Sequence, residues 1–318
     1  MVKSGVRPGP RVAIVTGAGN GLGRAYALRL AADGLRVIVN NRRREVDADG
    51  LGTADHVVRE IRAAGGEAVA NGDDVCADGA GLRMVEQALV TWGRLDVLVN
   101  NAGVGQHASF HKIPLAEFRS IFDVNFLGTV QVTHAAWPHL RTAGHGRVLV
   151  STSSAGLHGL HGLSAYAAAK GALISFAKSL AQEGASHDVF CNAIAPYAVT
   201  RMTDRADVSD ADRRAMAPER VAPLVAALVH EHSQINGQVL VVGQGWTRRA
   251  ATVELRELDR VDAEIPADAF SQRKGARLDV PGVCREFSDA LVAFHDFSAS
   301  VHEACEAMPQ GSSLRKSS

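Results

Sequence analysis

Residues 12–23 read VAIVTGAGNGLG, and this stretch decides the fold. A short β-branched run is followed by a glycine-rich turn and then by a helix-forming segment that extends to residue 32. Glycines allow a tight turn and let a pyrophosphate reach the N–H groups at the helix N-terminus, where the helix dipole favours negative charge. We therefore expect Gly17, Asn20, Gly21, Leu22 and Gly23 to contact a dinucleotide.

Short apolar runs alternate with helix-period segments from residue 8 to about residue 250. Most of these runs lack polar alternation, as strands covered by helices on both faces do. The segments between them place apolar residues at helical spacing, for example Ala54, Val57, Val58 and Ile61. We predict an α/β Rossmann-type, doubly wound parallel sheet over residues 8–250, with helices on both faces and seven strands at residues 12–15, 37–39, 67–70, 95–99, 147–150, 189–193 and 239–242.

The composition changes after residue 250. Residues 248–280 are rich in Arg, Asp and Glu and show no strand signal, whereas a helix is plausible around residues 287–297. We predict that residues 251–318 form a mostly helical C-terminal extension with a disordered tail. Because the extension is poor in apolar residues, we expect it to pack on the main domain or on a partner subunit.

Charge and cysteine content narrow the function classes. The 34 basic and 34 acidic side chains give a formal net charge of zero, which argues against nucleic acid and membrane surfaces as partners. The four cysteines show no C-x-x-C spacing, and no metal site is expected. The first eleven residues contain no apolar signal core, and the last three, KSS, are not a peroxisomal address. We expect a cytoplasmic protein.

The end of the second predicted strand bears on cofactor choice. An NAD enzyme normally places a carboxylate there for the ribose 2′-hydroxyl, but this chain has Asn41, followed by three arginines, Arg42 to Arg44. An arginine can clamp a 2′-phosphate, so NADP(H) is favoured and NAD(H) is possible. The alternative is that the arginines form a solvated loop. Asp74, beside Val75 at the end of the next strand, is a candidate for the adenine amino group or for a turn cap.

A candidate catalytic group lies later in the chain. Tyr166 and Lys170 are four residues apart and therefore share one helix face. A tyrosine with a pKa near 10 becomes useful near neutrality if that pKa falls by roughly 3 units, or about 4 kcal/mol. An ammonium group about 4 Å away supplies roughly that much at an effective dielectric constant near 20. Ser153, just after a predicted strand, can bind the reacting oxygen.

Together these motifs resemble the short-chain dehydrogenase/reductase family over approximately residues 8–250. Residues 100–103, NNAG, match the family's motif after the fourth strand, and Asn125 matches the asparagine that completes its catalytic tetrad. The resemblance implies that Tyr166 is the general acid/base, that Lys170 lowers the pKa of Tyr166 and binds the nicotinamide ribose, and that Ser153 orients the substrate oxygen. Asn125 would hold a water in a proton relay. The cofactor contacts implied are Gly17, Asn20, Gly21, Leu22, Gly23, Asn41, Arg42, Asp74, Val75, Asn101, Ala102, Gly103, Tyr166, Lys170, Pro196 and Val199.

Longer stretches narrow the resemblance further. TGAGNGLGRAYAL, VTHAAWPHL and IAPYAVTRMT are similar to the hydroxyacyl-CoA dehydrogenase unit of peroxisomal multifunctional enzymes. The chain differs from that unit at Asn41 and Asn125, where the unit carries an aspartate and a histidine. It also has Tyr197 where most family members have glycine, and this side chain would narrow the pocket or remain in a solvent-facing loop. His158 and His161 lie between Ser153 and Tyr166 in sequence, near the expected pocket mouth.

The leading hypothesis is a reversible carbonyl/alcohol oxidoreductase. Its substrate would be a 3-oxoacyl or 3-hydroxyacyl thioester, a steroid-like ketone or a biosynthetic intermediate. Two alternatives are a cofactor-binding scaffold or sensor with vestigial chemistry, and an epimerase or dehydratase that retains its cofactor. The resemblance also implies a homodimer or homotetramer that pairs through the tyrosine helix and the helix before it.

Overall fold

The computed structural model describes residues 9–43, 46–200, 203, 208–255, 284–287 and 290–306. The chain divides into two compact units, Met1–Ala250 and Ala251–Ser318, and each is described here by itself. Three expectations lie outside the described residues: the role of Arg44, the character of segment 256–283, and the disorder of the tail.

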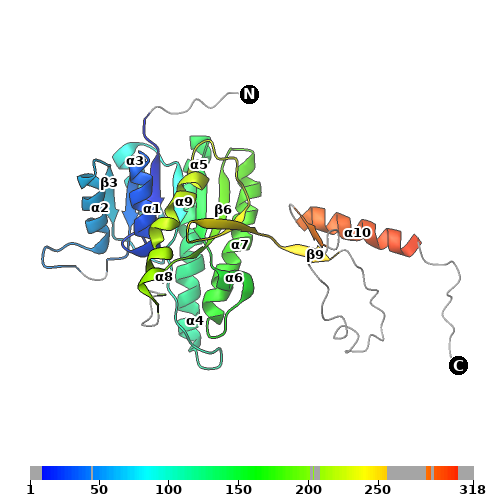
Figure 1. The fold of residues 1–318 in the computed structure, drawn as a ribbon. Helices are drawn as coiled ribbons and strands as arrows, with labels where there is room; N and C mark the ends of the chain where they lie inside the picture. Colours follow the sequence, from blue (N-terminus) through cyan, green and yellow to red (C-terminus); the bar gives the residue numbers. More distant parts are fainter. Residues whose placement is uncertain are drawn as a thin grey trace, which may run out of the picture. The chain divides into compact units, whose positions relative to one another are not determined.

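The first unit is built on one sheet of eight strands (Figure 1). Their order is β3-β2-β1-β4-β5-β6-β7-β8, and every neighbouring pair is parallel except β7 and β8. The predicted Rossmann-type parallel sheet is thus confirmed. The strands are β1 Val12–Val15, β2 Arg36–Asn40, β3 Ala68–Asn71, β4 Val97–Asn100, β5 Arg147–Ser151, β6 Phe190–Tyr197, β7 Val239–Gly243 and β8 Trp246–Ala250.

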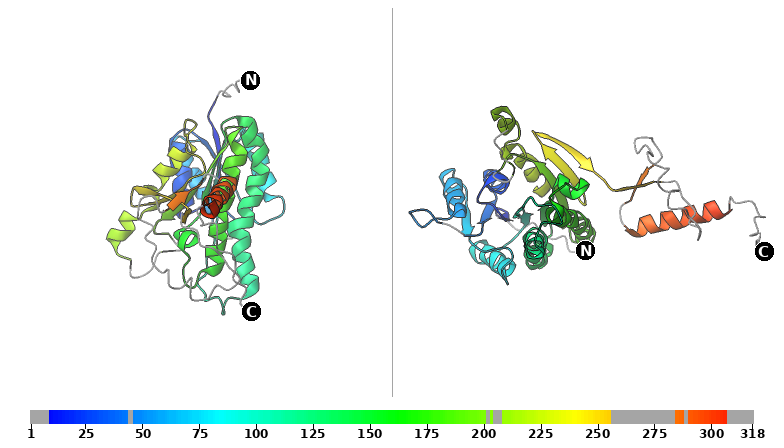
Figure 2. Two further views of the ribbon diagram at one scale, coloured as in Figure 1. Left: turned by 90° about the vertical axis from the view of Figure 1, so that its right-hand side faces the viewer. Right: turned by 90° about the horizontal axis from the view of Figure 1, so that it is seen from below.

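Helices cover both faces of this sheet (Figure 2). Val15 and Val39 pack on one face with α1, α2 and α9, whereas Ile14 and Ile38 pack on the other face with α3, α5 and α7. Both faces of a strand are therefore buried, which explains the absence of polar alternation in the sequence. The helices are α1 Gly21–Ala32, α2 Thr53–Ala63, α3 Ala80–Trp92, α4 Leu115–Phe122, the π-helix η1 Asp123–Leu127, α5 Gly128–Ala143, α6 Ser154–His158, α7 Ser164–Ala185, α8 Asp210–Ala215, the 3₁₀-helix η2 Pro218–Arg220, and α9 Ala222–Val229.

The eighth strand is an addition to the seven predicted. β8 turns back from β7 and pairs with it in antiparallel register, with Trp246 opposite Gly243 and Ala250 opposite Val239. Its sequence, WTRRA, alternates neither apolar with polar residues nor exposed with buried ones, and Trp246 is 82% exposed. The strand is held by backbone pairing to β7 and not by core packing, so no apolar pattern marks it.

The second unit contains a short antiparallel pair, β9 Val253–Leu255 and β10 Cys284–Glu286, and the helix α10 Ala290–Glu306. The helix expected around residues 287–297 is present but begins later and continues further. Arg285 of β10 forms an ion pair with Asp296 of α10. The two short strands were not foreseen, because three-residue strands carry too few positions for a periodic signal. No described helix is long and apolar enough to cross a membrane.

Candidate active site

The predicted site residues gather where the parallel strands end. In the order β3-β2-β1-β4-β5, the chain runs outward in one direction from β1 and in the other from β4, so the carboxyl ends of β1 and β4 flank the switch point where such sheets bind ligands. Thr16, directly after β1, ties the two sides together. Its Oγ1 accepts hydrogen bonds from the backbone N–H groups of Asn101 (3.0 Å) and Ala102 (3.1 Å).

The glycine turn fits a dinucleotide pyrophosphate. Gly17 has a φ of +62° and faces Ala102 so closely that a Cβ would lie 2.8 Å from its Cα. A Cβ on Gly23 would overlap the carbonyl oxygen of Gly17. The first hydrogen bond of α1 is donated by Arg24 N to Asn20 O (3.2 Å), and the side chain of Asn20 does not cap the helix. The preceding amides of the first turn are the groups that bind an anion at a helix N-terminus.

Asn41 and Arg42 lie at the end of β2, where the adenosine ribose is expected. The Asn41 amide donates to Thr53 Oγ1 (2.8 Å), and this arrangement leaves the Asn41 carbonyl oxygen as a neutral acceptor. Arg42 donates to Asp74 across the end of β3 (Nη1 to Oδ2, 2.7 Å). Burial raises the pKa of Asp74, but the amide of Cys76 and the Arg42 guanidinium outweigh it and hold that pKa below its ordinary value. Arg42 is thus held beside the cofactor end of the sheet.

Lys170 of α7 is buried at the centre of the site. Its Nζ donates to the backbone oxygen of Ser151 at the end of β5 (2.7 Å), and its side chain is 4% exposed. Burial lowers the pKa of Lys170 to about 8. A Cβ on Gly103 would lie 3.4 Å from Nζ and 2.7 Å from Asn125 Oδ1, so the loop after β4 passes directly over both groups.

Ser153 and Tyr166 meet beside Lys170. Ser153 is the N-cap of α6, and its Oγ accepts the amide of Ala155 (3.1 Å), which leaves the hydroxyl hydrogen free to be donated. Burial raises the pKa of Tyr166 above its ordinary value, and the neighbouring Ser153 hydroxyl acts against this rise.

The effect expected of Lys170 on the pKa of Tyr166 stays a prediction, because burial dominates the pKa of this phenol and raises it. Lys170 Nζ lies 5.6 Å from the centre of the Tyr166 ring and is itself so buried that its positive charge is disfavoured. The i,i+4 spacing brings the two side chains onto one helix face as predicted.

Asn125 occupies a π-helical turn, Asp123–Leu127, between α4 and α5. Its side-chain amide donates to the backbone oxygens of Val104 and Ile121, both at 2.7 Å, which fixes the side chain against the loop after β4. Its Oδ1 is buried and has no hydrogen-bond partner among the described residues. An unpaired buried acceptor beside Lys170 suits a polar ligand atom. The water expected there remains a prediction.

Other predicted residues surround this centre. Pro196 and Tyr197 end β6, Tyr197 is 49% exposed, and the amide of Val199 donates to Met216 O (2.8 Å). His158, the last residue of α6, and His161 are exposed. After Val199, residues 200–216 are described only at residues 200, 203 and 208–216.

Sequence reasoning missed three residues that shape the site. Thr16 was detectable from its place directly after the first strand. Thr53 and His107 carried no local signal, because each acts through a residue distant in sequence: Thr53 through Asn41, and His107 through Gly162.

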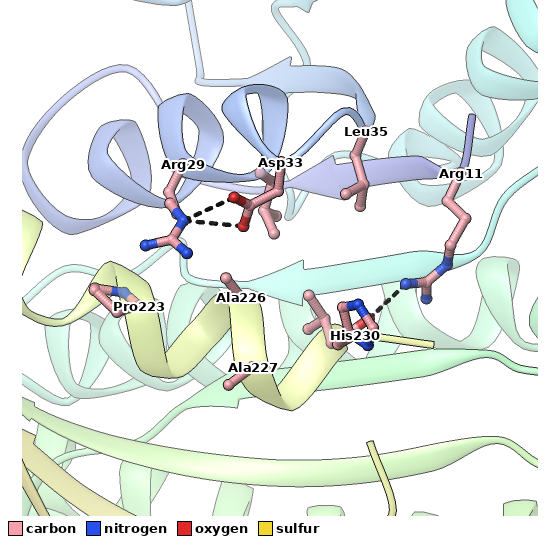
Figure 3. A pocket seen from close by; sticks show the side chains of 10 residues that line it. Arg11, Arg29, Asp33, Leu35, Pro223, Ala226, Ala227 and His230 are labelled. Atoms are coloured by element: carbon pink, nitrogen blue, oxygen red, sulfur yellow. Dashed lines mark hydrogen bonds and ion pairs between the residues drawn. The ribbon is translucent and has the colours of Figure 1, made fainter. Parts of the chain in front are cut away.

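The arrangement can hold a dinucleotide and move a proton at one oxygen. The glycine turn, Asn41 and the Arg42–Asp74 pair line the nucleotide side, and the loop at Asn101–Gly103 leads to the reactive side. There a phenol, a hydroxyl and a buried amine converge. By contrast, a hollow of about 390 Å³ at the amino-terminal edge, between α1 and α9, contains none of the predicted site residues (Figure 3).

Comparison with known proteins agrees with this geometry. The family model for short chain dehydrogenases matches residues 11–214. The chain is 45% identical to mouse (Mus musculus) peroxisomal multifunctional enzyme type 2 over 238 residues, which are 74% of this chain but only 32% of that enzyme. It is 43% identical over 244 residues to a Mycobacterium tuberculosis protein named as a short-chain type dehydrogenase/reductase, covering 76% of this chain and 85% of that one. The chain thus spans about a third of the mouse enzyme.

Solved structures show the same fold. A short chain dehydrogenase from Mycobacterium avium superposes with a TM-score of 0.73 at 38% identity, covering 82% of this chain and 93% of that one. A Beutenbergia cavernae structure, titled as an NAD(P)-dependent gluconate 5-dehydrogenase with bound NADP at low occupancy, superposes with a TM-score of 0.66 at 31% identity. It covers 75% of this chain and 97% of that one.

Proposed function

The chain belongs to the short-chain dehydrogenase family, and from this premise we propose that its site interconverts a carbonyl group and a secondary alcohol with NADP(H). The observation that carries the proposal is the placement of the Ser153 hydroxyl beside the phenol of Tyr166, next to buried Lys170. A phenol beside a serine hydroxyl, with an amine one helical turn away, is suited to exchanging a proton with one reacting oxygen. A bound nicotinamide supplies or accepts the hydride.

In this proposal each residue of the tetrad has one task. Ser153 donates a hydrogen bond to the substrate oxygen and fixes its position. Tyr166 gives its phenolic proton to that oxygen during reduction and takes the proton back during oxidation. Lys170 returns a proton to Tyr166 after the phenol has given its own away, and it also holds the cofactor ribose. The Oδ1 of Asn125 accepts a hydrogen bond from a water that links Lys170 to solvent.

The cofactor preference rests on the end of β2. Asn41 is uncharged and does not repel a 2′-phosphate, whereas Arg42 supplies a guanidinium at the neighbouring position. Among the relatives compared, the B. cavernae structure contains bound NADP at low occupancy. NADP(H) is therefore proposed as the preferred cofactor, with NAD(H) as the weaker one. In the absence of cofactor, the ion pair with Asp74 keeps the Arg42 guanidinium close to the position proposed for the 2′-phosphate.

The substrate is proposed only as a class: a 3-oxoacyl or 3-hydroxyacyl thioester, a steroid-like ketone, or a biosynthetic intermediate. The test is oxidation of NADPH and of NADH in parallel against a panel of ketones and β-ketoacyl thioesters. The proposal predicts turnover with at least one carbonyl class and a higher kcat/KM for NADPH. Absence of turnover with both cofactors across the panel overturns it.

Two further proposals accompany this function. A homodimer or homotetramer that pairs through α5 and α7 would be detected by light scattering at micromolar concentration, and a monomer would reject it. A cytoplasmic location is proposed from the sequence, whereas the mouse relative is named as peroxisomal. Subcellular fractionation distinguishes the two compartments.

A further inference from the structure

Two loops beside the tetrad carry histidines and no acidic side chain. Residues 101–113 contain His107, His111 and Lys112, and residues 152–165 contain His158 and His161; neither stretch has an aspartate or glutamate. Four of the 13 histidines thus lie in two short loops. The following segment 201–207, of which only Thr203 is described, has two arginines and two aspartates and adds no net charge.

The structure joins these two loops. The amide of Ala108 donates to the carbonyl oxygen of Gly162 at 2.8 Å. The His107 ring lies directly against Gly162, so that a Cβ at this position would overlap the imidazole. Gly162 also has a φ of +78°, which favours glycine. His107 therefore reaches from the loop after β4 to the loop that leads into α7.

This contact places His107 at the rim of the reactive centre. Four residues before it, Gly103 passes over Lys170 and Asn125. Four residues after Gly162, Tyr166 lies in the first turn of α7. The other loop begins at Ser153, which caps α6, and α6 ends at His158. Each of the two loops therefore lies only a few residues in sequence from a tetrad residue or from the Gly103 contact.

The imidazoles of this histidine rim, defined as His107, His158 and His161, are available to a ligand. All three residues are exposed, and none of their rings has a hydrogen-bond partner among the described residues. Exposed apolar side chains accompany them, since Phe110 is 73% and Leu160 is 60% exposed. Imidazoles without a competing carboxylate nearby can donate their ring N–H groups to a ligand.

We propose that the histidine rim recognises an oxyanion, a carboxylate or a phosphate, carried by the carbonyl substrate on an apolar body, and that His107 determines this specificity. The inference rests on the proposed function of the same site. Its physical basis is charge-assisted hydrogen bonding from imidazole to the oxyanion, with Phe110 and Leu160 contacting the apolar part.

The test measures binding and does not depend on turnover. Hexanoate, hexyl phosphate and hexanol are titrated by calorimetry into the full chain saturated with NADPH. The proposal predicts that one or both anions bind at least tenfold more tightly than hexanol, and the stronger of the two identifies the oxyanion. Equal affinity of all three probes overturns the proposal, and it does so even if the chain turns over other carbonyl compounds.

Variants then assign the effect to the rim. His107→Leu is expected to weaken anion binding about tenfold and to change hexanol binding less than twofold. The matched control His134→Leu, at an exposed position on α5, should change neither. A His107→Leu, His158→Leu and His161→Leu triple variant removes every imidazole N–H from the rim, and unchanged anion binding in this variant overturns the proposal. NADPH fluorescence verifies that each variant is folded and binds the cofactor.

Discussion

Buried charged side chains have different partners at the two edges of the parallel sheet. At the amino-terminal edge, Arg94 and Asp96 form a buried pair with two hydrogen bonds of 2.8 Å, and Asp96 also accepts the amide of Val12. At the carboxyl edge, Lys170 is equally buried, but the acceptor of its Nζ is the uncharged backbone oxygen of Ser151. Removing one member of a buried ion pair is costly, whereas a buried charge without an oppositely charged partner has its pKa displaced.

The difference shows which edge stabilises the fold and which one reacts. The amino edge is further fastened by Arg147, which forms an ion pair with Asp188 and also donates to the backbone oxygens of Gly146, Asp188, Glu231 and Ser233. At the hollow in Figure 3, Arg29 binds both carboxylate oxygens of Asp33 in an exposed pair, and Arg11 donates to the backbone oxygen of Val229 at the end of α9. We expect substitutions at the amino edge to change stability and substitutions at the carboxyl edge to change activity.

The largest effect is expected from Tyr166→Phe. Removing the phenolic hydroxyl eliminates the proton donor, so kcat should fall about 10³-fold or more. Stability should change by about 1 kcal/mol or less, the net contribution of one hydrogen bond. Stopped-flow turnover and urea unfolding measure the two quantities. If kcat falls less than tenfold while NADPH still binds, then the site is a scaffold or uses another acid.

The amino edge should give the opposite result in Asp96→Asn. The change removes the negative charge that faces Arg94 in the protein interior and should lower the free energy of unfolding by about 3 kcal/mol. The kcat of the remaining folded enzyme should stay within twofold. The control is Asp33→Asn, which breaks the exposed pair with Arg29 and should cost about 0.5 kcal/mol. Equal losses in the two variants would contradict the contrast between the edges.

Lys170→Met should abolish activity and yet stabilise the fold at neutral pH. The pKa of Lys170 is lowered from 10.5 to about 8, a displacement equivalent to about 3 kcal/mol. Below pH 8 the lysine is protonated in both the folded and unfolded states, and the full penalty for burying the ammonium is present. Between pH 8 and 10.5 the folded state releases its proton first, so the stability of the wild-type chain should rise with pH.

Urea unfolding at pH 7 and at pH 10 tests this sign. The Lys170→Met variant should be more stable than the wild type by about 2 kcal/mol at pH 7, and the gap should narrow at pH 10. Lys112→Met, at an exposed position, is the control and should show no such gap. A gap that widens with pH would mean that Lys170 is stabilised as an ammonium in the folded state.

Much of this organisation was predictable because it depends on local pattern. The strands β1, β2 and β5 are buried on both faces, so each is an apolar run that stands out in the sequence. The glycine turn is readable because steric crowding at Gly17 and Gly23 admits no side chain. Tyr166 and Lys170 are readable because helix geometry fixes the relation of residues four apart.

The remaining features depend on contacts between distant segments, which no local pattern reports. β8 is held by backbone pairing with β7, and its side chains are free to be polar. Arg42 was predicted as a candidate for a phosphate, but the sequence does not show that Asp74, 32 residues away, already binds it. Similarly, the direction of the Tyr166 pKa shift depends on how deeply both groups are buried.

The smallest effect is expected at the Arg42–Asp74 pair, which sharpens the comparison because it is a charge pair at the reactive edge. Both side chains are about one third exposed, so water already screens the pair, and Arg42→Leu should cost less than 1 kcal/mol of stability. If Arg42 contacts the 2′-phosphate, the same change should raise the KM for NADPH about tenfold and leave the KM for NADH within twofold. Arg62→Leu, at an exposed position on α2, is the matched control and should alter neither KM. A parallel rise in both KM values would show that Arg42 shapes the whole adenosine site through Asp74. The Arg42–Asp74 pair would then have a structural role, like the ion pairs at the amino edge.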